Sequence, residues 1–590
     1  MKERSKLFAA IALAVFIYVV LRAIFVPISH DEAVTYLLYV QRGHFLPHNM
    51  IWDANNHILN SVLMYPVYKI FGVHILSLRL PNVMAFPVYA FFIYKLLSKL
   101  RSHLVFYLGA MALLSAPLLL DFFAQARGYG ISMATFAGGL YFMNRYFSTG
   151  LPKYQWFVWL FFSLTLAANM SMMNSYLIAL GLIAVMAVRK FGFSNLKGHL
   201  LPYAIGGLLP FAGFSIYAMA MRQRGLLYYG EKDGFVEITV RLLNKFVFYS
   251  DDLFLARVVA VLGVIFGGYL IFLWVKRQLH SPDTGTISAV FLLGNAAGAI
   301  LLCHLLEVNY PEDRTGLYFV PLFILAATFA FDSVVAKVPL MKFTALSLAV
   351  IPVLAITGGN IGYTRLWREL HIHPGLYEYI ADRHPDDNTT VESYFLTATS
   401  WGYNTIIHNT LLSPIIPTRF ANNRADYAIC YRDRCDGLAL THDTVYKDPR
   451  NDIYLMKRNL PWEWEAFEQA EELLKYEGND EFINFYVTED SVTLARFEAM
   501  DLRLSVKSDA EPLLCDIVIS ARNENDKVIH YEFMALNWMR EKWDGNTLQA
   551  RRMVKLPEGS HKLVCYVWNM KEAEISVAFE EITLLESATE

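Results

Sequence analysis

Two adjacent carboxylates, Asp31 and Glu32, follow directly after the first long apolar run of the chain. Charged side chains so close to membrane hydrocarbon are costly, and they usually serve a function. A carboxylate in this place can act as a general base that takes a proton from an attacking hydroxyl group. The competing interpretation is a solvated loop charge that caps the apolar helix expected from Ala33, because Asp is a preferred N-cap residue. The pair alone leaves both interpretations open.

Other polar residues gather in the loops that we expect on the same side of the membrane. Their carboxylates, amides and rings can bind a polar ligand, and guanidinium groups can hold an anion because they stay charged and bind two oxygens. For each arginine, the alternative is contact with lipid headgroups or pairing with a nearby acid such as Asp121, Glu312 or Asp313. The gathered residues include Asn55, Asn56, His57, Arg79, Asp121, Gln125, Arg127, Tyr129, Asn169, Asn174, Arg222 and Arg314.

The composition predicts a membrane domain followed by a soluble one. The chain has 590 residues, of which 55% are hydrophobic and 18% charged, and its mean hydropathy is +0.33. Apolar blocks fill about the first 360 residues, whereas the rest is ordinary in composition. The net charge of −3 gives no indication of nucleic-acid binding. The N-terminus begins like a signal peptide, but its apolar stretch of about 20 residues lacks a small-residue cleavage site, so we expect a retained span.

Apolar runs of spanning length predict about eleven membrane helices. The stretch from 155 to 188 is the least certain, because the segment from Asn169 to Asn174 barely interrupts it. A shorter amphipathic piece, His57 to Phe71, contains Pro66 and is typical of a helix that lies at the membrane interface. The predicted spans lie near 6–27, 82–98, 104–120, 130–147, 155–169, 173–188, 200–221, 255–275, 286–304, 316–333 and 343–359.

Clusters of basic residues test this count. With eleven spans every cluster lies on one side, which the positive-inside rule identifies as the cytoplasm. The N-terminus is then cytoplasmic and the C-terminal part lies outside. The clusters are Lys2, Arg4 and Lys6; Lys95, Lys99 and Arg101; Arg145 and Lys153; Arg189, Lys190 and Lys197; Lys276 and Arg277; Lys337 and Lys342.

The polar residues named above therefore converge on the outer face of the membrane. A transporter more often buries such groups near the midplane of the bilayer, between paired repeats, and the sequence contains no internal repeat. The pattern indicates an active site at the outer surface.

The motifs in these loops resemble those of the GT-C glycosyltransferases that use polyprenyl-phosphate sugars. The most similar groups are the protein O-mannosyltransferases and the aminoarabinose transferases of lipid A. The likeness covers about residues 1–360. Four features carry the likeness: Asp31-Glu32 after the first span, the long outer loop with its short helix, Arg79-Leu80-Pro81 opening the second span, and DFFAQARGYG from Asp121 to Gly130. A later segment, YPEDRTGLYFVPL from Tyr310 to Leu322, is also similar to that of bacterial members.

Two departures separate the chain from these groups. Relatives often have a His-Pro-Pro or Lys-Pro-Pro triplet near the interfacial helix, where this chain has Asn55-Asn56-His57. This leaves the specificity for the sugar and the acceptor open. The C-terminal part also has no obvious counterpart in the aminoarabinose enzymes.

Position, side-chain chemistry and the resemblance together give each candidate residue an expected role. Asp31 is the expected base, and Glu32 positions the acceptor or pairs with an arginine. No cofactor is required, and no compact ligand spacing supports the alternative of a divalent ion on Asp31, Glu32, His57 and Asp121. The expected ligands of the donor phosphate are Arg127, Arg314, Arg79 and Arg222. The expected sugar- or acceptor-binding residues are Asn55, Asn56, His57, Asp121 and Tyr129.

The function that the resemblance implies is transfer of a monosaccharide from a polyprenyl-phosphate lipid to an acceptor hydroxyl, with inversion at the anomeric carbon. The acceptor is a lipid, a glycan or a protein. The implied location is the periplasmic face of a bacterial inner membrane. Two alternatives are a transporter or flippase for a lipid-linked sugar, and a non-catalytic, membrane-anchored factor that binds glycans.

The part after Ile361 reads as two periplasmic domains, beyond a transmembrane catalytic domain over 1–360. Short strands and helical patches predict a small α/β domain over 361–460, and regularly spaced strands predict a jelly-roll-like β-sandwich over 461–590. Trp538, Trp543 and Trp568 can stack on sugars or pack in the sandwich. An oxidising compartment allows disulfides between Cys430 and Cys435 and between Cys515 and Cys565, with free thiols as the alternative.

Overall fold

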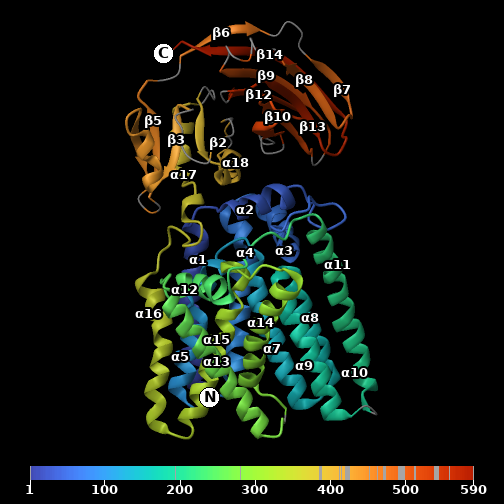
Figure 1. The fold of residues 1–590 in the computed structure, drawn as a ribbon, viewed down its shortest axis with the longest axis vertical. Helices are drawn as coiled ribbons and strands as arrows, with labels where there is room; N and C mark the ends of the chain where they lie inside the picture. Colours follow the sequence, from blue (N-terminus) through green and yellow to red (C-terminus); the bar gives the residue numbers. More distant parts are fainter. Residues whose placement is uncertain are drawn as a thin grey trace. The chain divides into compact units, whose positions relative to one another are not determined.

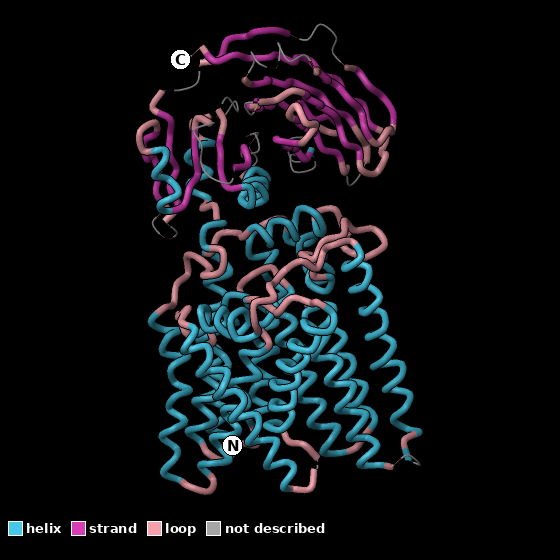
Figure 2. Tube along the Cα trace, viewed as in Figure 1, coloured by secondary structure: helices cyan, strands magenta, loops and turns pink. Residues whose placement is uncertain are grey.

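The fold is described from a computed structural model in which the chain forms two compact units (Figures 1 and 2). One unit contains Met1–Val26 and His44–Ile361, and the other contains Pro27–Gly43 and Gly362–Glu590. The segment that carries Asp31 and Glu32 thus belongs to the unit of the C-terminal part. The described residues are 2–192, 195–279, 281–384, 389–408, 410, 412, 415–418, 425–448, 450, 452–460, 463–469, 474–489, 494, 498–510, 513–536, 544–556 and 559–588.

The first unit is helical throughout, as the cyan tube of Figure 2 shows. Its apolar runs form helices because a helix satisfies every backbone polar group within the segment. These helices are α1 (Lys2–Phe25), α3 (Ile58–Phe71), α4 (Ile75–Leu97), α5 (His103–Ser115), α6 (Pro117–Phe123), α7 (Gly128–Thr149), α8 (Pro152–Ala168), α9 (Met173–Phe191), α10 (Lys197–Leu201), α11 (Leu209–Gln223), α12 (Arg241–Val247), α13 (Leu253–Lys276), α14 (Thr284–Leu306), α15 (Phe319–Val335) and α16 (Val350–Thr357).

Within the described residues, eight helical segments are long and apolar enough to cross a membrane, or nine if the bent pair α5 and α6 forms one span. Each predicted run lies largely within a helical segment, but the count of about eleven is not confirmed. Helix α8 has only 17 residues, fewer than the roughly 20 that a span needs. The predicted short helix is present as α3, which begins one residue later, at Ile58, and continues through Pro66.

Small residues let the helices of this unit pack closely. A Cβ atom added to Gly139 of α7 would lie 2.8 Å from the Phe162 ring of α8, which is too close for an ordinary contact. Between α5 and α15, a Cβ atom on Gly109 would lie 2.5 Å from Thr328. Glycine at these two positions therefore sets the spacing of helices that position the loops at their ends.

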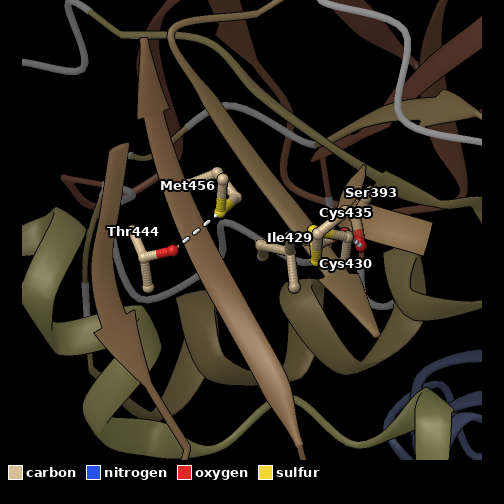
Figure 3. The surroundings of a disulfide bond; sticks show 6 residues. All are labelled: Ser393, Ile429, Cys430, Cys435, Thr444 and Met456. Carbon is tan, nitrogen blue, oxygen red and sulfur yellow. Dashed lines mark hydrogen bonds between the residues drawn. A yellow bond between two sulfur atoms is a disulfide. The ribbon is translucent and has the colours of Figure 1, made fainter. Parts of the chain in front are cut away.

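The second unit contains a mixed sheet that confirms the predicted α/β region. Its strands follow the order β2 (Ile416–Thr418), β1 (Val391–Tyr394), β3 (Tyr427–Tyr431), β5 (Ile453–Arg458) and β4 (His442–Lys447), and β1 runs parallel to β2 and β3. Helices α17 (Pro374–Ala381) and α18 (Ala398–Ile407) contribute to its core. Cys430 at the end of β3 is bonded to Cys435, as Figure 3 shows.

The remaining strands form the predicted β-sandwich. One sheet has the order β11 (Val528–Ala535), β10 (Cys515–Arg522), β13 (Lys562–Asn569) and β8 (Phe482–Thr488). The other has the order β12 (Thr547–Lys555), β9 (Ala499–Lys507), β14 (Ile575–Ser587) and β6 (Trp464–Gln469), with β7 (Lys475–Gly478) also on β14.

Alternate residues of both sheets fill one apolar core, as the period of two requires. Cys515 and Cys565 lie in this core as free thiols, so the second disulfide is not formed. Trp538 and Trp543 lie outside the described residues, whereas Trp568 lies on β13.

Candidate functional site

The segment Pro27–Gly43 of the second unit presents the predicted carboxylates. It contains α2 (His30–Val34), which continues into a π-helical stretch, Thr35–Val40. The sequence Ser-x-x-Glu starts this helix: Ser29 donates from its backbone N and its Oγ to Glu32 Oε2, at 3.0 Å each. Glu32 is 1% exposed, while Asp31 in the same turn is partly exposed. Glu32 therefore organises the helix start, and Asp31 is the more accessible carboxylate.

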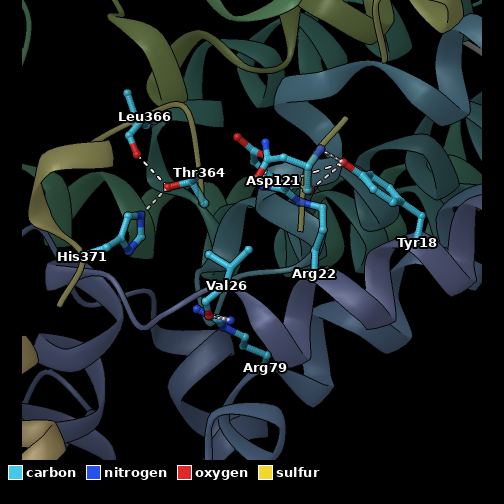
Figure 4. A network of polar contacts seen from close by, with 9 residues as sticks. Tyr18, Arg22, Val26, Arg79, Asp121, Thr364, Leu366 and His371 are labelled. Atoms are coloured by element: carbon cyan, nitrogen blue, oxygen red, sulfur yellow. Dashed lines mark hydrogen bonds and ion pairs between the residues drawn. The ribbon is translucent and has the colours of Figure 1, made fainter. Parts of the chain in front are cut away.

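Three residues of the second unit, two of them on α18, hold this segment. Thr399 of α18 lies with its Oγ1 2.9 Å from His30 Nδ1. The rings of Tyr36 and Tyr403 meet edge to face, with centroids 6.0 Å apart. Figure 4 labels the third contributor, His371, whose Nδ1 lies 3.4 Å from the carbonyl oxygen of Ile28. The C-terminal part thus fixes the turn that bears Asp31.

In the first unit, three predicted residues, Asn55, His57 and Tyr129, come together around Arg127. Arg127 is the N-cap residue of α7 and is 2% exposed. Its Nη1 donates to the backbone oxygen of Asn55 at 3.1 Å and also to Asn55 Oδ1. Its guanidinium carbon lies 5.8 Å from the ring centroid of Tyr129, whose ring lies 4.7 Å from that of His57. His57 Nδ1 in turn lies 2.6 Å from the carbonyl oxygen of Ala168.

Two buried asparagines position the loop that contains Arg127. Asn82 of α4 donates to Asn60 of α3 at 2.7 Å, and Asn60 donates to the carbonyl oxygen of Ala126 at 3.2 Å. Asn82 Oδ1 accepts from the backbone N of Ile131 at 3.3 Å. Sequence reasoning missed both asparagines, although an asparagine in an apolar helix is a usable signal.

Gln125 is a further polar residue of this loop to which the sequence analysis gave no role. It is 1% exposed, and neither its amide oxygen nor its amide nitrogen has a hydrogen-bond partner among the described residues. A buried amide left in this state costs about 1–3 kcal/mol. Its backbone oxygen accepts from Arg127 N at 2.9 Å, so the amide belongs to the Arg127 loop. A bound ligand with hydroxyl groups would satisfy it.

Asp121 pairs with Arg22, which lies much further away in the sequence than Arg127. Figure 4 shows it beside Arg22 of α1, with which it forms a buried ion pair. Arg22 also donates to the carbonyl oxygen of Asn360, to which Tyr18 donates at 2.9 Å. Asp121 therefore neutralises a buried cation, which is required because an unpaired charge there would be very unfavourable.

Arg79 and Arg222 both donate to carbonyl oxygens at helix ends. Arg79 is fully buried (Figure 4). Its Nη1 donates to the carbonyl oxygen of Val26, just beyond the end of α1, at 2.7 Å, and to that of Ala23, in the last turn of α1, at 3.2 Å. Arg222 donates to Leu306 at the end of α14, at 3.0 Å. Such contacts satisfy carbonyl groups that have no partner within their own helix.

Arg314 is held by an aromatic ring and an acid. Its Nη1 donates to the hydroxyl of Tyr229 at 2.6 Å, and its guanidinium carbon lies 4.0 Å from the centroid of that ring. The Tyr229 hydroxyl donates to Asp313 Oδ2 at 2.6 Å. Burial and the charge of Asp313 raise the pKa of Tyr229 despite the opposite effect of Arg314. Burial and the neighbouring Asp313 also raise the pKa of Glu312.

Asn56 completes the predicted set. Its Nδ2 donates to the carbonyl oxygen of Phe45 at 3.0 Å, and its Oδ1 accepts from Ser61 at 3.0 Å. It therefore fixes the turn that leads into α3. Across the described ranges, no group of three or more His, Cys, Asp or Glu residues is arranged to hold a metal ion.

The comparison with known proteins finds sugar transferases at low similarity. No family model and no curated protein match the chain. Arabinosyltransferase EmbB from Mycobacterium smegmatis is 10% identical, with a TM-score of 0.40; the match covers 98% of this chain but only 64% of EmbB. ArnT from Cupriavidus metallidurans is 12% identical over 77% of this chain and 97% of ArnT, with a TM-score of 0.43.

A third match is the archaeal oligosaccharyltransferase AglB from Archaeoglobus fulgidus, in complex with an inhibitory peptide and a dolichol-phosphate. It is 9% identical over 94% of each chain, with a TM-score of 0.43. These proteins are sugar transferases, the kind that the sequence resemblance names. At these TM-scores the likeness is distant, and the fold and the site stand on the chain's own residues.

Proposed function

We propose that the chain is an integral-membrane glycosyltransferase that moves a monosaccharide from a polyprenyl-phosphate lipid to an acceptor hydroxyl. The buried Arg127 at the start of α7, within a loop that also holds Gln125, is the observation that carries the proposal. A permanent cation at a helix N-terminus favours phosphate, because the helix dipole and the guanidinium act in the same direction. The neighbouring His57 and Tyr129 supply a ring and polar atoms suited to a sugar.

The proposed reaction is a direct displacement at the anomeric carbon. Asp31 takes the proton of the acceptor hydroxyl while the hydroxyl oxygen forms the new bond to the anomeric carbon. The bond between the anomeric carbon and the phosphate oxygen breaks, and its electron pair stays on the phosphate of the lipid. Arg127 stabilises the negative charge that develops there, and Arg314 is a second candidate for this task. Attack from the face opposite the leaving group inverts the configuration.

The apolar helices fit this function because the isoprenoid chain of such a donor stays in the bilayer. We place the reaction at the periplasmic face of a bacterial inner membrane, with the N-terminus in the cytoplasm. The sidedness of the basic clusters supports this placement. The Cys430–Cys435 disulfide in the C-terminal part is also typical of an oxidising compartment.

A transfer assay tests the proposal. The purified chain in detergent is incubated with radiolabelled polyprenyl-phosphate sugars and an envelope extract, and wild type is compared with Asp31→Asn. We expect label to move to a component of the extract with wild type only, and that component identifies the acceptor. Transfer by both proteins would remove Asp31 as the base. If the lipid binds but no sugar is transferred, the transporter and the glycan-binding factor become the better explanations.

A further inference from the structure

The four-stranded sheet of the sandwich has an unusual outer face. Ile517, Met534 and Val567 point into the core from three neighbouring strands, so the residues that alternate with them point outward. The outward residues include five aromatic rings, which we call the aromatic sheet face. It consists of Phe482 on β8, Tyr531 and Phe533 on β11, and Tyr566 and Trp568 on β13.

These rings are accessible. Phe482 is 55% exposed, Tyr531 44% and Phe533 38%, while Tyr566 and Trp568 are partly buried between them. The outer face of a sandwich is normally polar, and contiguous exposed apolar residues on a folded protein mark an interaction surface. The aromatic sheet face is therefore expected to have a partner.

The rings form a platform rather than scattered contacts. Trp568 is directly opposite Phe482 across β13 and β8, and their rings are nearly parallel, at 12°, with centroids 6.0 Å apart. Tyr566 lies with its ring centroid 5.9 Å from that of Phe482. A flat aromatic surface of this kind matches the apolar C–H face of a pyranose or furanose ring.

A buried carboxylate lies within this platform. Asp516 on β10 is the cross-strand neighbour of Trp568 on one side and Ala535 on the other. It is 6% exposed, and its Oδ1 has no hydrogen-bond partner within the described part of the chain. Four residues further along the same face, Ser520 is opposite Tyr531 and equally buried. Such an oxygen accepts hydrogen bonds from the hydroxyl groups of a sugar.

We propose that the aromatic sheet face binds a carbohydrate chain, which is the acceptor of the transferred sugar. The carboxylate favours a neutral, hydroxyl-rich ligand over an anionic lipid surface. It accepts hydrogen bonds from hydroxyl groups, whereas it repels negatively charged headgroups. Asp516 also interacts with Arg42, at the end of the segment that carries Asp31. The platform and the segment that carries the candidate base belong to one unit. The acceptor role, but not the binding itself, rests on the proposed function.

Binding is tested on the full chain in detergent by fluorescence anisotropy, with dye-labelled linear oligosaccharides of glucose, mannose, galactose, arabinose and N-acetylglucosamine. We expect at least one to bind saturably, Trp568→Ala to weaken it about tenfold or more, and Trp568→Phe to weaken it less than about threefold, since a ring is retained. Tyr531→Ala repeats the test at an exposed ring whose loss does not disturb the core. Leu440→Ala, at a side chain that is 94% exposed in the same unit, is the matched control.

Failure of every oligosaccharide to bind folded wild type would overturn the proposal, as would binding that the Trp568 and Tyr531 variants leave unchanged. A membrane contact is detected with a fluorophore on Tyr531→Cys in nanodiscs: quenching by doxyl-labelled lipid, but not by iodide in solution, would also overturn it. If oligosaccharide binds and no sugar transfer occurs, the binding site stands and the transferase function fails. With transfer, Trp568→Ala is expected to raise KM for the acceptor about tenfold and to change kcat less than twofold.

Discussion

Thr399 and His30 lie 369 positions apart in the chain, and their side chains meet within the second unit, with Thr399 Oγ1 2.9 Å from His30 Nδ1. His30 directly precedes Asp31 in α2, so this contact orients the turn that presents the candidate base. A general base must lie within hydrogen-bond reach of the proton that it removes. The C-terminal part of the chain is thus expected to contribute to turnover without touching the donor.

We predict that Thr399→Ala lowers kcat by about tenfold and leaves the affinity for the donor lipid unchanged. The physical reason is that α2 loses one of its side-chain contacts, while Arg127 in the other unit is untouched. Transfer rates and equilibrium binding of a fluorescent polyprenyl phosphate measure the two effects. Thr399→Ser keeps the hydroxyl group and should restore the rate to within about twofold. Equal loss in both variants would show that the methyl packing, and not the hydrogen bond, matters.

Arg127→Ala should weaken binding of the polyprenyl phosphate by about tenfold or more, because the only permanent charge of its loop is removed. Arg222→Ala provides a matched arginine, since it is on the surface and donates to the end of α14. We expect less than a twofold change there. Arg127 is buried, so thermal unfolding of the variant is measured in parallel. An unchanged affinity of a folded Arg127→Ala protein would remove Arg127 from the phosphate site.

Gln125→Leu should have opposite effects on stability and on activity. The amide of Gln125 is buried and has no partner among the described residues, so its replacement by an apolar group of similar size should raise the free energy of unfolding by about 1–3 kcal/mol. The same change removes the amide that we expect to bind the sugar, so turnover should fall about tenfold or more. Asn60→Leu is the comparison, because Asn60 is hydrogen-bonded to Ala126 and Asn82 and its loss should destabilise the protein. A Gln125→Leu protein that is less stable than wild type would contradict this account.

Local features of the fold could be predicted from the sequence, because they depend on neighbouring residues. The apolar runs gave the helices, and the alternating strands gave the sandwich, since both patterns follow from burial of one face. The start of α2 shows how such signals are misassigned: the sequence pattern offers Asp31 as the N-cap residue, whereas Ser29 caps the helix and Glu32 completes the capping box. The number of spans was harder to predict, because a helix such as α8 is too short for length and hydropathy to show whether it crosses the membrane.

The partners of the charged residues could not be predicted, because they come from distant parts of the chain. Arg22 and Asp121 are 99 positions apart, and nothing in either local sequence names the other. The contact between the segment around Asp31 and α18 is harder still to predict, since the two lie more than half of the chain apart. Gln125 shows a different limit: that its amide has no partner within the described part of the chain is visible only in three dimensions.

Asp516 should make the stability of the second unit depend on pH. Burial raises the pKa of its carboxyl from 3.8 to about 6, against the attraction of Arg42. An acid whose pKa is higher in the folded state takes up its proton on folding, so its stabilising effect is full below about pH 4 and is lost as the pH rises through 6. Relative to Asp516→Asn, wild type should therefore gain on the order of 2 kcal/mol in unfolding free energy between pH 7.5 and pH 4.

Thermal unfolding of both proteins across this range, followed by the circular dichroism of the strands, measures the difference. Comparison of wild type with the variant at each pH cancels the titration of every other group, including Glu532, whose pKa is lowered by Arg552 and by His530 despite its burial. Asp526→Asn serves as the exposed control, at a surface carboxylate that pairs with Arg522. A constant difference between wild type and Asp516→Asn across this range would mean that folding does not raise the pKa of the Asp516 carboxyl. In that case Arg42, and not burial, would control Asp516.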